Sequence, residues 1–168
     1  MEVKILPKKD LKDFWEIQKE YLDKWNFDYL EEEYSRHPEL YIGCYDGGKL
    51  IGIAYGFVRG NIVTLQGIAV VHENWRMGIG SKILKFFENM VKQTGKKTIG
   101  VGSAEGFVEK FYFKNGYRPV EIQAKDKQGK IIKKEKVESY EDGFRKKEKL
   151  KELTRPKEVI FIMEKNIN

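Results

Sequence analysis

A chain of 168 residues, 40% of them hydrophobic, is long enough to bury a substantial core, so one domain spanning residues 1–168 is expected. Its single cysteine, Cys44, excludes an internal disulfide framework or a cysteine cluster for a metal, and is expected to be a buried structural thiol. No segment has the roughly 20 apolar residues of a membrane span, and the N-terminus lacks a signal-peptide core. These absences favour a cytoplasmic protein without a membrane partner.

The charges favour no particular partner strongly. Thirty-two Lys and Arg exceed 26 Asp and Glu, which gives a net charge of +6. Such an excess would suit an acidic partner such as RNA or a polyphosphate ligand. Both signs are abundant and mixed along the chain, however, so a solvated surface is favoured over nucleic-acid binding.

The first half of the chain predicts a strand, two helices and three further strands. After a strand over Glu2–Leu6, apolar residues recur at spacings of three and four from Lys9 to Lys24, which is typical of an amphipathic helix. A shorter helix, Asp28–Arg36, ends before a His-Pro pair. Turn sequences rich in glycine then separate strand-like runs. The three runs are Leu40–Asp46, Lys49–Gly60 and Ile62–Val71.

The second half alternates helices with strands. A helix with a strong apolar face precedes Gly95, which is expected to cap it in the left-handed conformation. A charged segment, 121–157, is expected to contain a hairpin arm and a basic helix from Tyr140 to Leu153. The apolar anchors expected for that helix are Phe144, Leu150 and Leu153. The other expected elements are a strand at Thr98–Gly102, a short helix within Ala104–Gly116, and strands at Tyr117–Lys125, Ile131–Val137 and Glu158–Lys165.

Two glycines, Gly78 and Gly80, stand between a predicted strand and the first of these helices. Such a turn gathers unpaired backbone N–H groups at the positive end of the helix dipole and attracts anions. Ser81 would add a hydroxyl donor, although a plain tight turn would also use two glycines. The dinucleotide fingerprint needs a third glycine where Ile83 stands, and a P-loop needs Lys before Ser or Thr. Both of these nucleotide-binding motifs are therefore excluded.

The segment 65–88 resembles the acetyl-CoA-binding segment of the GNAT superfamily of N-acetyltransferases, whose signature is Gln or Arg, two residues, Gly, one residue, and Gly or Ala. Trp75 stands where the family has Gln or Arg, and Arg76 is displaced by one position. A second segment, 111–117, is similar to the family's Phe-Tyr-x-x-x-Gly-Phe element. The resemblance extends over residues 40–120.

The resemblance implies a mixed α/β fold. Its central sheet would be twisted and mostly antiparallel, with about seven strands, flanking helices and a splay between strands four and five. It also implies acetyl-CoA as cosubstrate and no metal. The pyrophosphate would bind the amides of the glycine turn, and pantetheine would pair with the preceding strand. The residues implied in binding are Ile68, Ala69, Val70, Trp75, Arg76, Met77, Gly78, Ile79, Gly80, Ser81 and Phe111.

The implied reaction is direct attack of an amine on the acetyl carbonyl. A backbone N–H near Ala69 or Val70 would stabilise the tetrahedral oxyanion. Tyr112, by its place in the aromatic motif, would protonate the departing thiolate. Packing of Tyr112 with Phe111 and Phe113 is the alternative interpretation.

The general base is left open. Glu105 stands seven residues before the motif tyrosine, where the family often has Asn, and could contact pantetheine or the amine. Thr64 and Gln66 occupy the strand where some relatives place a catalytic Glu. Glu73, beside His72, could pass a proton to water, although such loop residues are more often only solvated.

The acceptor is expected to be a primary amine. In the family, acceptor specificity comes from the first two helices and the last strands, and here Glu31–Glu33 makes this region acidic. An aromatic, acidic cleft suits a cationic small molecule, a protein N-terminus or a lysine. The aromatic residues are Trp15, Tyr21, Trp25, Phe27, Tyr29 and Tyr34.

A second interpretation is a non-catalytic acetyl-CoA-binding module for sensing or scaffolding. In that case the basic arm within 121–157 would contact protein or nucleic acid. The same arm could instead cover the acceptor site or form a homodimer, so the oligomeric state is left open.

Overall fold

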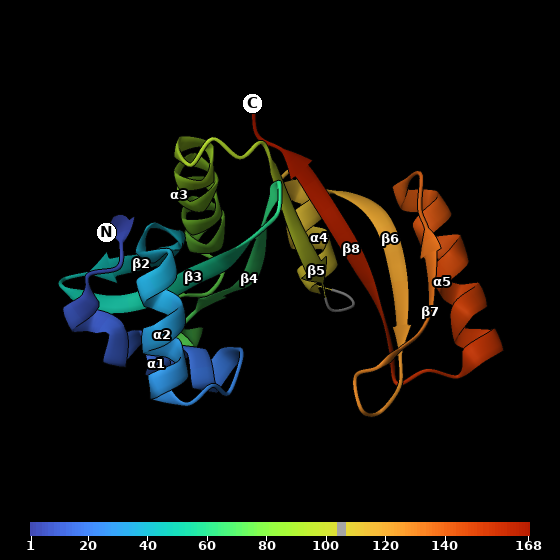
Figure 1. Cartoon of the computed structure of the whole chain (residues 1–168), viewed down its shortest axis with the longest axis horizontal. Helices are drawn as coiled ribbons and strands as arrows, with labels where there is room; N and C mark the ends of the chain where they lie inside the picture. The colour runs from blue at the N-terminus through green and yellow to red at the C-terminus, as the bar shows by residue number, and fades with distance from the viewer. Residues whose placement is uncertain (104–106) are drawn as a thin grey trace. The chain divides into compact units, whose positions relative to one another are not determined.

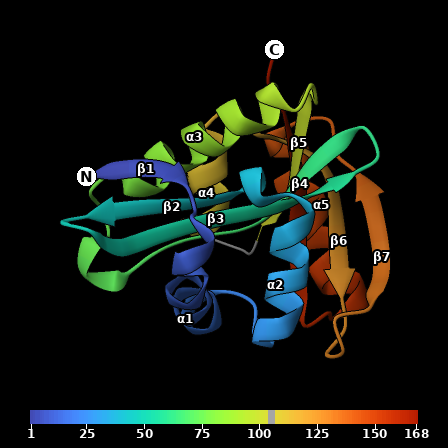
Figure 2. The same cartoon turned by 60° about the vertical axis from the view of Figure 1, so that its left-hand side comes forward.

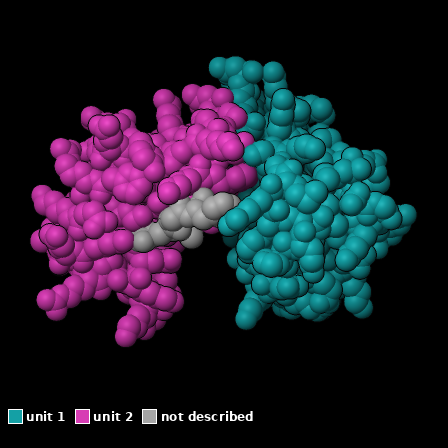
Figure 3. Space-filling view, turned by 180° about the vertical axis from the view of Figure 1, so that it is seen from behind, with its two compact units in different colours: residues 1–99, 167–168 teal, residues 100–166 magenta. Residues whose placement is uncertain are grey.

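The computed structural model describes residues 1–103 and 107–168 and divides into two compact units. Unit 1 comprises residues 1–99 with 167–168, and unit 2 comprises residues 100–166 (Figure 3). The described residues form eight strands and five α-helices, so the mixed α/β class is confirmed (Figure 1). Whether both units act as one domain with a charged insertion stays a prediction.

Unit 1 contains an antiparallel sheet in the order β1-β2-β3-β4. Helices α1 and α2 cover one face of this sheet and α3 covers the other (Figure 2). The strands are β1 (Glu2–Ile5), β2 (Tyr41–Asp46), β3 (Lys49–Arg59) and β4 (Ile62–Val70). The helices are α1 (Leu11–Tyr21), α2 (Phe27–Arg36) and α3 (Ile79–Gln93).

The two faces of β3 differ because alternate side chains point to opposite sides of a sheet. On the α1 face, Tyr55 packs edge-on against Phe14 of α1 at 5.5 Å between ring centroids. On the α3 face, a Cβ added to Gly52 would lie 2.6 Å from Ile83 Cδ1. Helix α3 therefore sits close to the strand only because the residue beneath it has no side chain.

Unit 2 is built around a hairpin and a return strand. Strand β6 (Arg118–Lys125) pairs antiparallel with both β7 (Ile131–Lys136) and β8 (Glu158–Asn166). The fifth strand, β5 (Thr98–Ser103), begins two residues before the unit boundary. Two helices complete the unit, α4 (Phe107–Lys114) and α5 (Tyr140–Thr154).

The predicted elements agree with the observed ones to within a few residues at each end. There are eight strands in the described residues rather than about seven, because the expected hairpin arm pairs as β7. Gly95 has a positive φ of 83°, as expected for a left-handed cap after α3, and Cys44 is fully buried. The splay between β4 and β5 stays a prediction.

One predicted anchor of α5 is wrong. Leu153 is 64% exposed, whereas Leu150 is 1% exposed. The buried positions of α5 include Gly143 and Lys147, spaced four apart and three before Leu150. Leu153 lies off this stripe because the helical repeat of 3.6 residues places Thr154 there instead.

None of the helices among the described residues is both long and apolar enough to cross a membrane.

Candidate functional site

The turn before α3 gathers backbone donors at one point of unit 1. Gly78 caps the helix with φ +73°, and Arg76 also has a positive φ, +62°. The first hydrogen bond of the helix runs from the Lys82 N–H to the Gly78 carbonyl at 3.3 Å. The amides of Ile79 and Gly80, and of the serine after them, precede it and have no carbonyl within the helix to bind. Successive amides in this arrangement form an anion-binding concavity.

The charge around this turn suits an anion. Among the described residues, the first turn of α3 carries no acidic side chain. Arg76, Met77 and Lys82 are exposed, and a Cβ added to Gly78 would meet nothing within 4 Å. A phosphate group can therefore approach the amides without a clash or an opposing charge.

Trp75 takes a structural role where relatives carry Gln or Arg. Its indole Nε1 donates to the Val70 carbonyl at 2.6 Å, and its ring lies edge-on to that of His72 at 4.6 Å. This bond ties the turn to the end of β4. The side chain is 53% exposed, so one face of the ring is open to solvent or to a ligand.

The hydrogen-bond register divides the strand residues predicted to bind pantetheine. The Val71 N–H donates to the Ile51 carbonyl at 2.9 Å, so this residue directs its backbone groups toward β3. Because such pairs alternate along an antiparallel ladder, Ala69 also faces β3. Ile68 and Val70 direct their N–H and C=O groups to the other edge, where the Val70 carbonyl accepts from the Trp75 indole.

In unit 2, α4 presents the tyrosine of the aromatic motif. Tyr112 is 3% exposed and packs edge-on against Phe111 at 5.2 Å and Tyr117 at 5.5 Å. Phe113 packs elsewhere, 4.0 Å from the ring of Tyr140. Burial raises the pKa of the Tyr112 phenol above its ordinary value, so the group keeps its proton at neutral pH. Glu105 lies outside the described residues.

A buried ion pair, which was not predicted from the sequence, joins α4 to α5. Lys147 Nζ lies 2.6 Å from Glu109 Oε1, and both side chains are at most 4% exposed. The ammonium also lies over the rings of Phe144 and Phe161, at 5.5 and 5.3 Å. The two charged residues are 38 positions apart, so no helical spacing could have predicted the pair.

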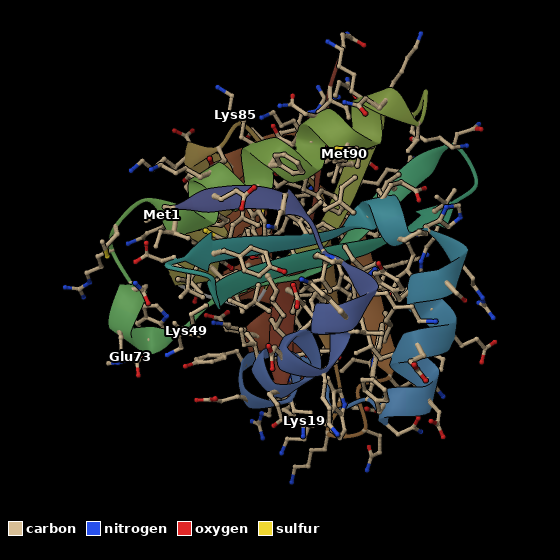
Figure 4. The ribbon with its side chains drawn as sticks, turned by 90° about the vertical axis from the view of Figure 1, so that its left-hand side faces the viewer. Met1, Lys19, Lys49, Glu73, Lys85 and Met90 are labelled. Atoms are coloured by element: carbon tan, nitrogen blue, oxygen red, sulfur yellow. The ribbon has the colours of Figure 1, made fainter. Side chains whose placement is uncertain are left out.

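The two loop residues considered for proton transfer lie on the surface. His72 and Glu73 are exposed in a short 3-10 helix, and Figure 4 shows Glu73 on this turn, beyond the end of the sheet. The His72 N–H donates to the Tyr21 hydroxyl at 3.1 Å, which connects the end of α1 to this turn. A base role for either residue stays a prediction.

Asp23, which was not predicted as a site residue, lies in the loop after α1 and contacts a side chain of β4. The Tyr55 hydroxyl donates to Asp23 Oδ2 at 2.5 Å, and Gln66 Nε2 donates to the same oxygen at 3.2 Å. Gln66 has no opposite residue on β3, because Gly67 pairs with Tyr55 and the next pair skips to Leu65. Such a β-bulge re-aims a side chain, here toward the carboxylate.

Together the fold and the turn before α3 define a mixed α/β protein with unpaired backbone amides at a helix N-terminus. Residues 9–117 match the model of the acetyltransferase (GNAT) family. The chain therefore belongs to the GNAT family of acetyltransferases. The described residues hold no group of three or more His, Cys, Asp or Glu that could bind a metal.

Solved structures with the same fold are acetyltransferases of several kinds. The ribosomal-protein-S18-alanine N-acetyltransferase from Escherichia coli is 18% identical, with a TM-score of 0.68 over 99% of this chain and 94% of its own. Ard1 from Thermoplasma volcanium is 12% identical, with a TM-score of 0.73 over 99% and 97%. An aminoglycoside 6'-N-acetyltransferase complexed with coenzyme A is 15% identical, with a TM-score of 0.71 over 100% and 98%. No curated protein sequence matches the chain.

Proposed function

We propose that this protein transfers the acetyl group of acetyl-CoA to a primary amine. The observation that carries the proposal is the N-terminus of α3, where Gly78 opens the turn and three consecutive amides precede the first helical bond. Similar structures were solved with coenzyme A, one an aminoglycoside acetyltransferase and one the NatB acetyltransferase complex. The amides at the N-terminus of α3 and the positive end of the helix dipole both favour binding of the pyrophosphate of such a ligand.

The remaining cosubstrate contacts follow from the strand register. Ile68 directs its backbone groups away from β3, so it is proposed to pair with the amides of pantetheine. The Val70 carbonyl already accepts from the Trp75 indole, which leaves its N–H as the better candidate for the oxyanion. A donor fixed in this way needs no reorganisation when charge develops.

The proposed reaction is a direct transfer. A neutral amine attacks the acetyl carbonyl carbon, the tetrahedral oxyanion collapses, and the carbon–sulfur bond breaks. The thiolate takes the proton of Tyr112, while the surplus proton of the amine passes to water or to a base. The phenol of Tyr112 is protonated at neutral pH, as a group that donates a proton to the thiolate must be.

The amine class is proposed from the same relatives. Two of the similar structures are named for their acceptors, a protein alanine and an aminoglycoside. Both offer an amine, and they differ in size and in the number of cationic groups. A primary amine, on a small molecule, a protein N-terminus or a lysine, is the acceptor class that they share.

An assay of thiol release tests the proposal. The protein would be incubated with labelled acetyl-CoA and a panel that includes a peptide with a free N-terminal alanine, an aminoglycoside and an alkyl diamine. Label should appear on at least one amine, with an equal amount of free coenzyme A. Tight cofactor binding without acceptor-dependent thiol release would instead identify a non-catalytic module, and absence of cofactor binding would exclude both functions.

A further inference from the structure

The carboxylate of Asp23 is held by neutral donors and has no cation beside it. Its two hydrogen bonds among the described residues, from the Tyr55 hydroxyl and the Gln66 amide, both end on Oδ2. Its second oxygen, Oδ1, has no partner among residues 1–103 and 107–168, and Asp23 forms no ion pair there. A half-buried carboxylate fixed in this way is pre-organised for a positively charged ligand.

Aromatic rings pack around Trp25, which contacts Tyr55, the residue whose hydroxyl binds the carboxylate. Trp25 lies edge-on to Tyr55 at 5.4 Å and to Tyr29 at 4.9 Å, and it stacks on Phe57 at 5.7 Å. Its backbone is fixed because the Trp25 carbonyl accepts from the Trp15 indole at 2.8 Å. Rings beside a carboxylate attract ammonium groups through their negative faces.

A second buried polar group borders the carboxylate's hydrogen bonds. Gln18 of α1 is fully buried, and its amide lies beside the Tyr55 hydroxyl but has no hydrogen bond of ordinary geometry among the described residues. Burial, followed by the hydrogen bond to Asp23, raises the pKa of Tyr55, and the neighbouring Gln18 amide opposes that rise. The unpartnered amide therefore borders the same network of polar groups.

The cluster reaches the surface, and the neighbouring segment of the chain carries exposed acids. Gln66 and Tyr29 are exposed, so the carboxylate lies below an accessible rim. Asp28 and Glu31 of α2 are also exposed nearby in sequence. The chain has a net charge of +6, yet Asp23, Asp28 and Glu31 form no ion pair among the described residues. Such a local group of acids favours a cationic ligand.

We infer that Asp23, with Tyr55, Gln66 and the Trp25 ring, forms a subsite for an alkylammonium group of the acceptor. The subsite implies that the acceptor is a cationic amine. This inference rests on the acetyl transfer proposed above. Asp23 is the residue that selects the charge, and Tyr55 and Gln66 orient its carboxylate.

Direct binding tests the subsite without turnover. The probe is 1,4-diaminobutane, its neutral analogue is 1,4-butanediol, and the readout is the chemical shift of the Trp25 indole N–H. The wild-type protein should bind the diamine saturably and ignore the diol. Asp23→Asn should weaken diamine binding by about tenfold to a hundredfold, since a charge-assisted contact is lost. No saturable shift, or equal binding by wild type and Asp23→Asn, overturns the inference.

Two further variants control for structural effects. Asp28→Asn removes an exposed acid of the same region and should leave the diamine affinity unchanged. Tyr55→Phe removes a donor but keeps the carboxylate, so its loss of affinity should be smaller than that of Asp23→Asn. An equal loss in Asp28→Asn would assign the effect to general charge and contradict the subsite.

Kinetics then separate the subsite from the reaction. With an active cationic acceptor, Asp23→Asn should raise the acceptor KM about tenfold and leave the dissociation constant of acetyl-CoA unchanged. Transfer by the wild type with an unchanged KM in the variant would reject the subsite and keep the function. Asp23-dependent diamine binding without transfer to any amine would keep the subsite and reject the function.

Discussion

At the scale of single residues, the chemistry depends on groups whose surroundings fix their protonation. Tyr112 is buried beside two aromatic rings, and this burial raises the pKa of its phenol. A neutral phenol suits the donation of a proton to a thiolate. His72 and Glu73, by contrast, are exposed on the surface.

Tyr112→Phe should lower kcat by about 10²- to 10⁴-fold, the usual range for a general acid, and leave the affinity for coenzyme A unchanged. Steady-state kinetics and calorimetry measure the two quantities. Because the pKa of Tyr112 is raised, the wild-type rate should show no fall from this group as pH rises toward the ordinary tyrosine value. A variant with full activity would assign Tyr112 to packing alone.

At the scale of elements, the proposed cofactor site depends on the glycine turn that begins α3. The glycines at its two ends, Gly78 and Gly95, both have positive φ and open space where a Cβ would stand. They differ in position, because Gly78 lies at the amide cluster that begins α3 and Gly95 follows the end of the helix. Because their backbone conformations are similar, substitutions at the two glycines can be compared directly.

Gly78→Ala and Gly95→Ala should each cost about 1 kcal/mol of stability, since a Cβ is strained at positive φ. Only Gly78→Ala should also weaken coenzyme A binding, by roughly tenfold, because it distorts the amides that face the pyrophosphate. Denaturant titrations and calorimetry distinguish the two effects. Equal cofactor affinity in both variants would contradict an anion site at this turn.

The buried pair Glu109–Lys147 is the second feature at this scale, since it joins α4 to α5. Glu109→Gln should destabilise the protein by up to about 3–5 kcal/mol, because it removes the carboxylate 2.6 Å from a buried lysine charge. The double variant with Lys147→Met should recover much of this loss. Additive losses in a double-mutant cycle measured by urea unfolding would show that the two side chains act independently.

At the scale of the whole molecule, function is expected to be coupled to stability through the cosubstrate. The amide cluster exists only in the folded state, because it needs β4, the turn and α3 together. A ligand that binds the folded chain alone must stabilise it in proportion to its concentration.

Coenzyme A at a hundred times its dissociation constant should therefore add about 2.7 kcal/mol of stability and raise Tm by about 5–10 °C. Thermal unfolding followed by circular dichroism measures the shift. Inorganic sulfate at the same concentration is the control, and it should give a much smaller rise. A Tm that does not depend on coenzyme A would contradict cosubstrate binding.

The local elements could be predicted because their signals lie in neighbouring residues. The helical stripe before Gly95, the glycine-rich turns and the two family motifs each occupy one short segment. Helix caps and strand ends therefore agree with the structure closely. Leu153 was misplaced because three apolar residues in a basic helix do not fix which side of it is buried.

The sequence by itself determined the class of protein, the elements and the glycine turn, because main-chain geometry and helix dipoles depend on local residue order. Only the tertiary structure revealed the partners of Asp23 and of Glu109, which lie more than 30 positions away. It also decided which edge of β4 each residue faces, through the register with β3. Contacts between distant segments follow from packing and register, and no spacing along the chain encodes them.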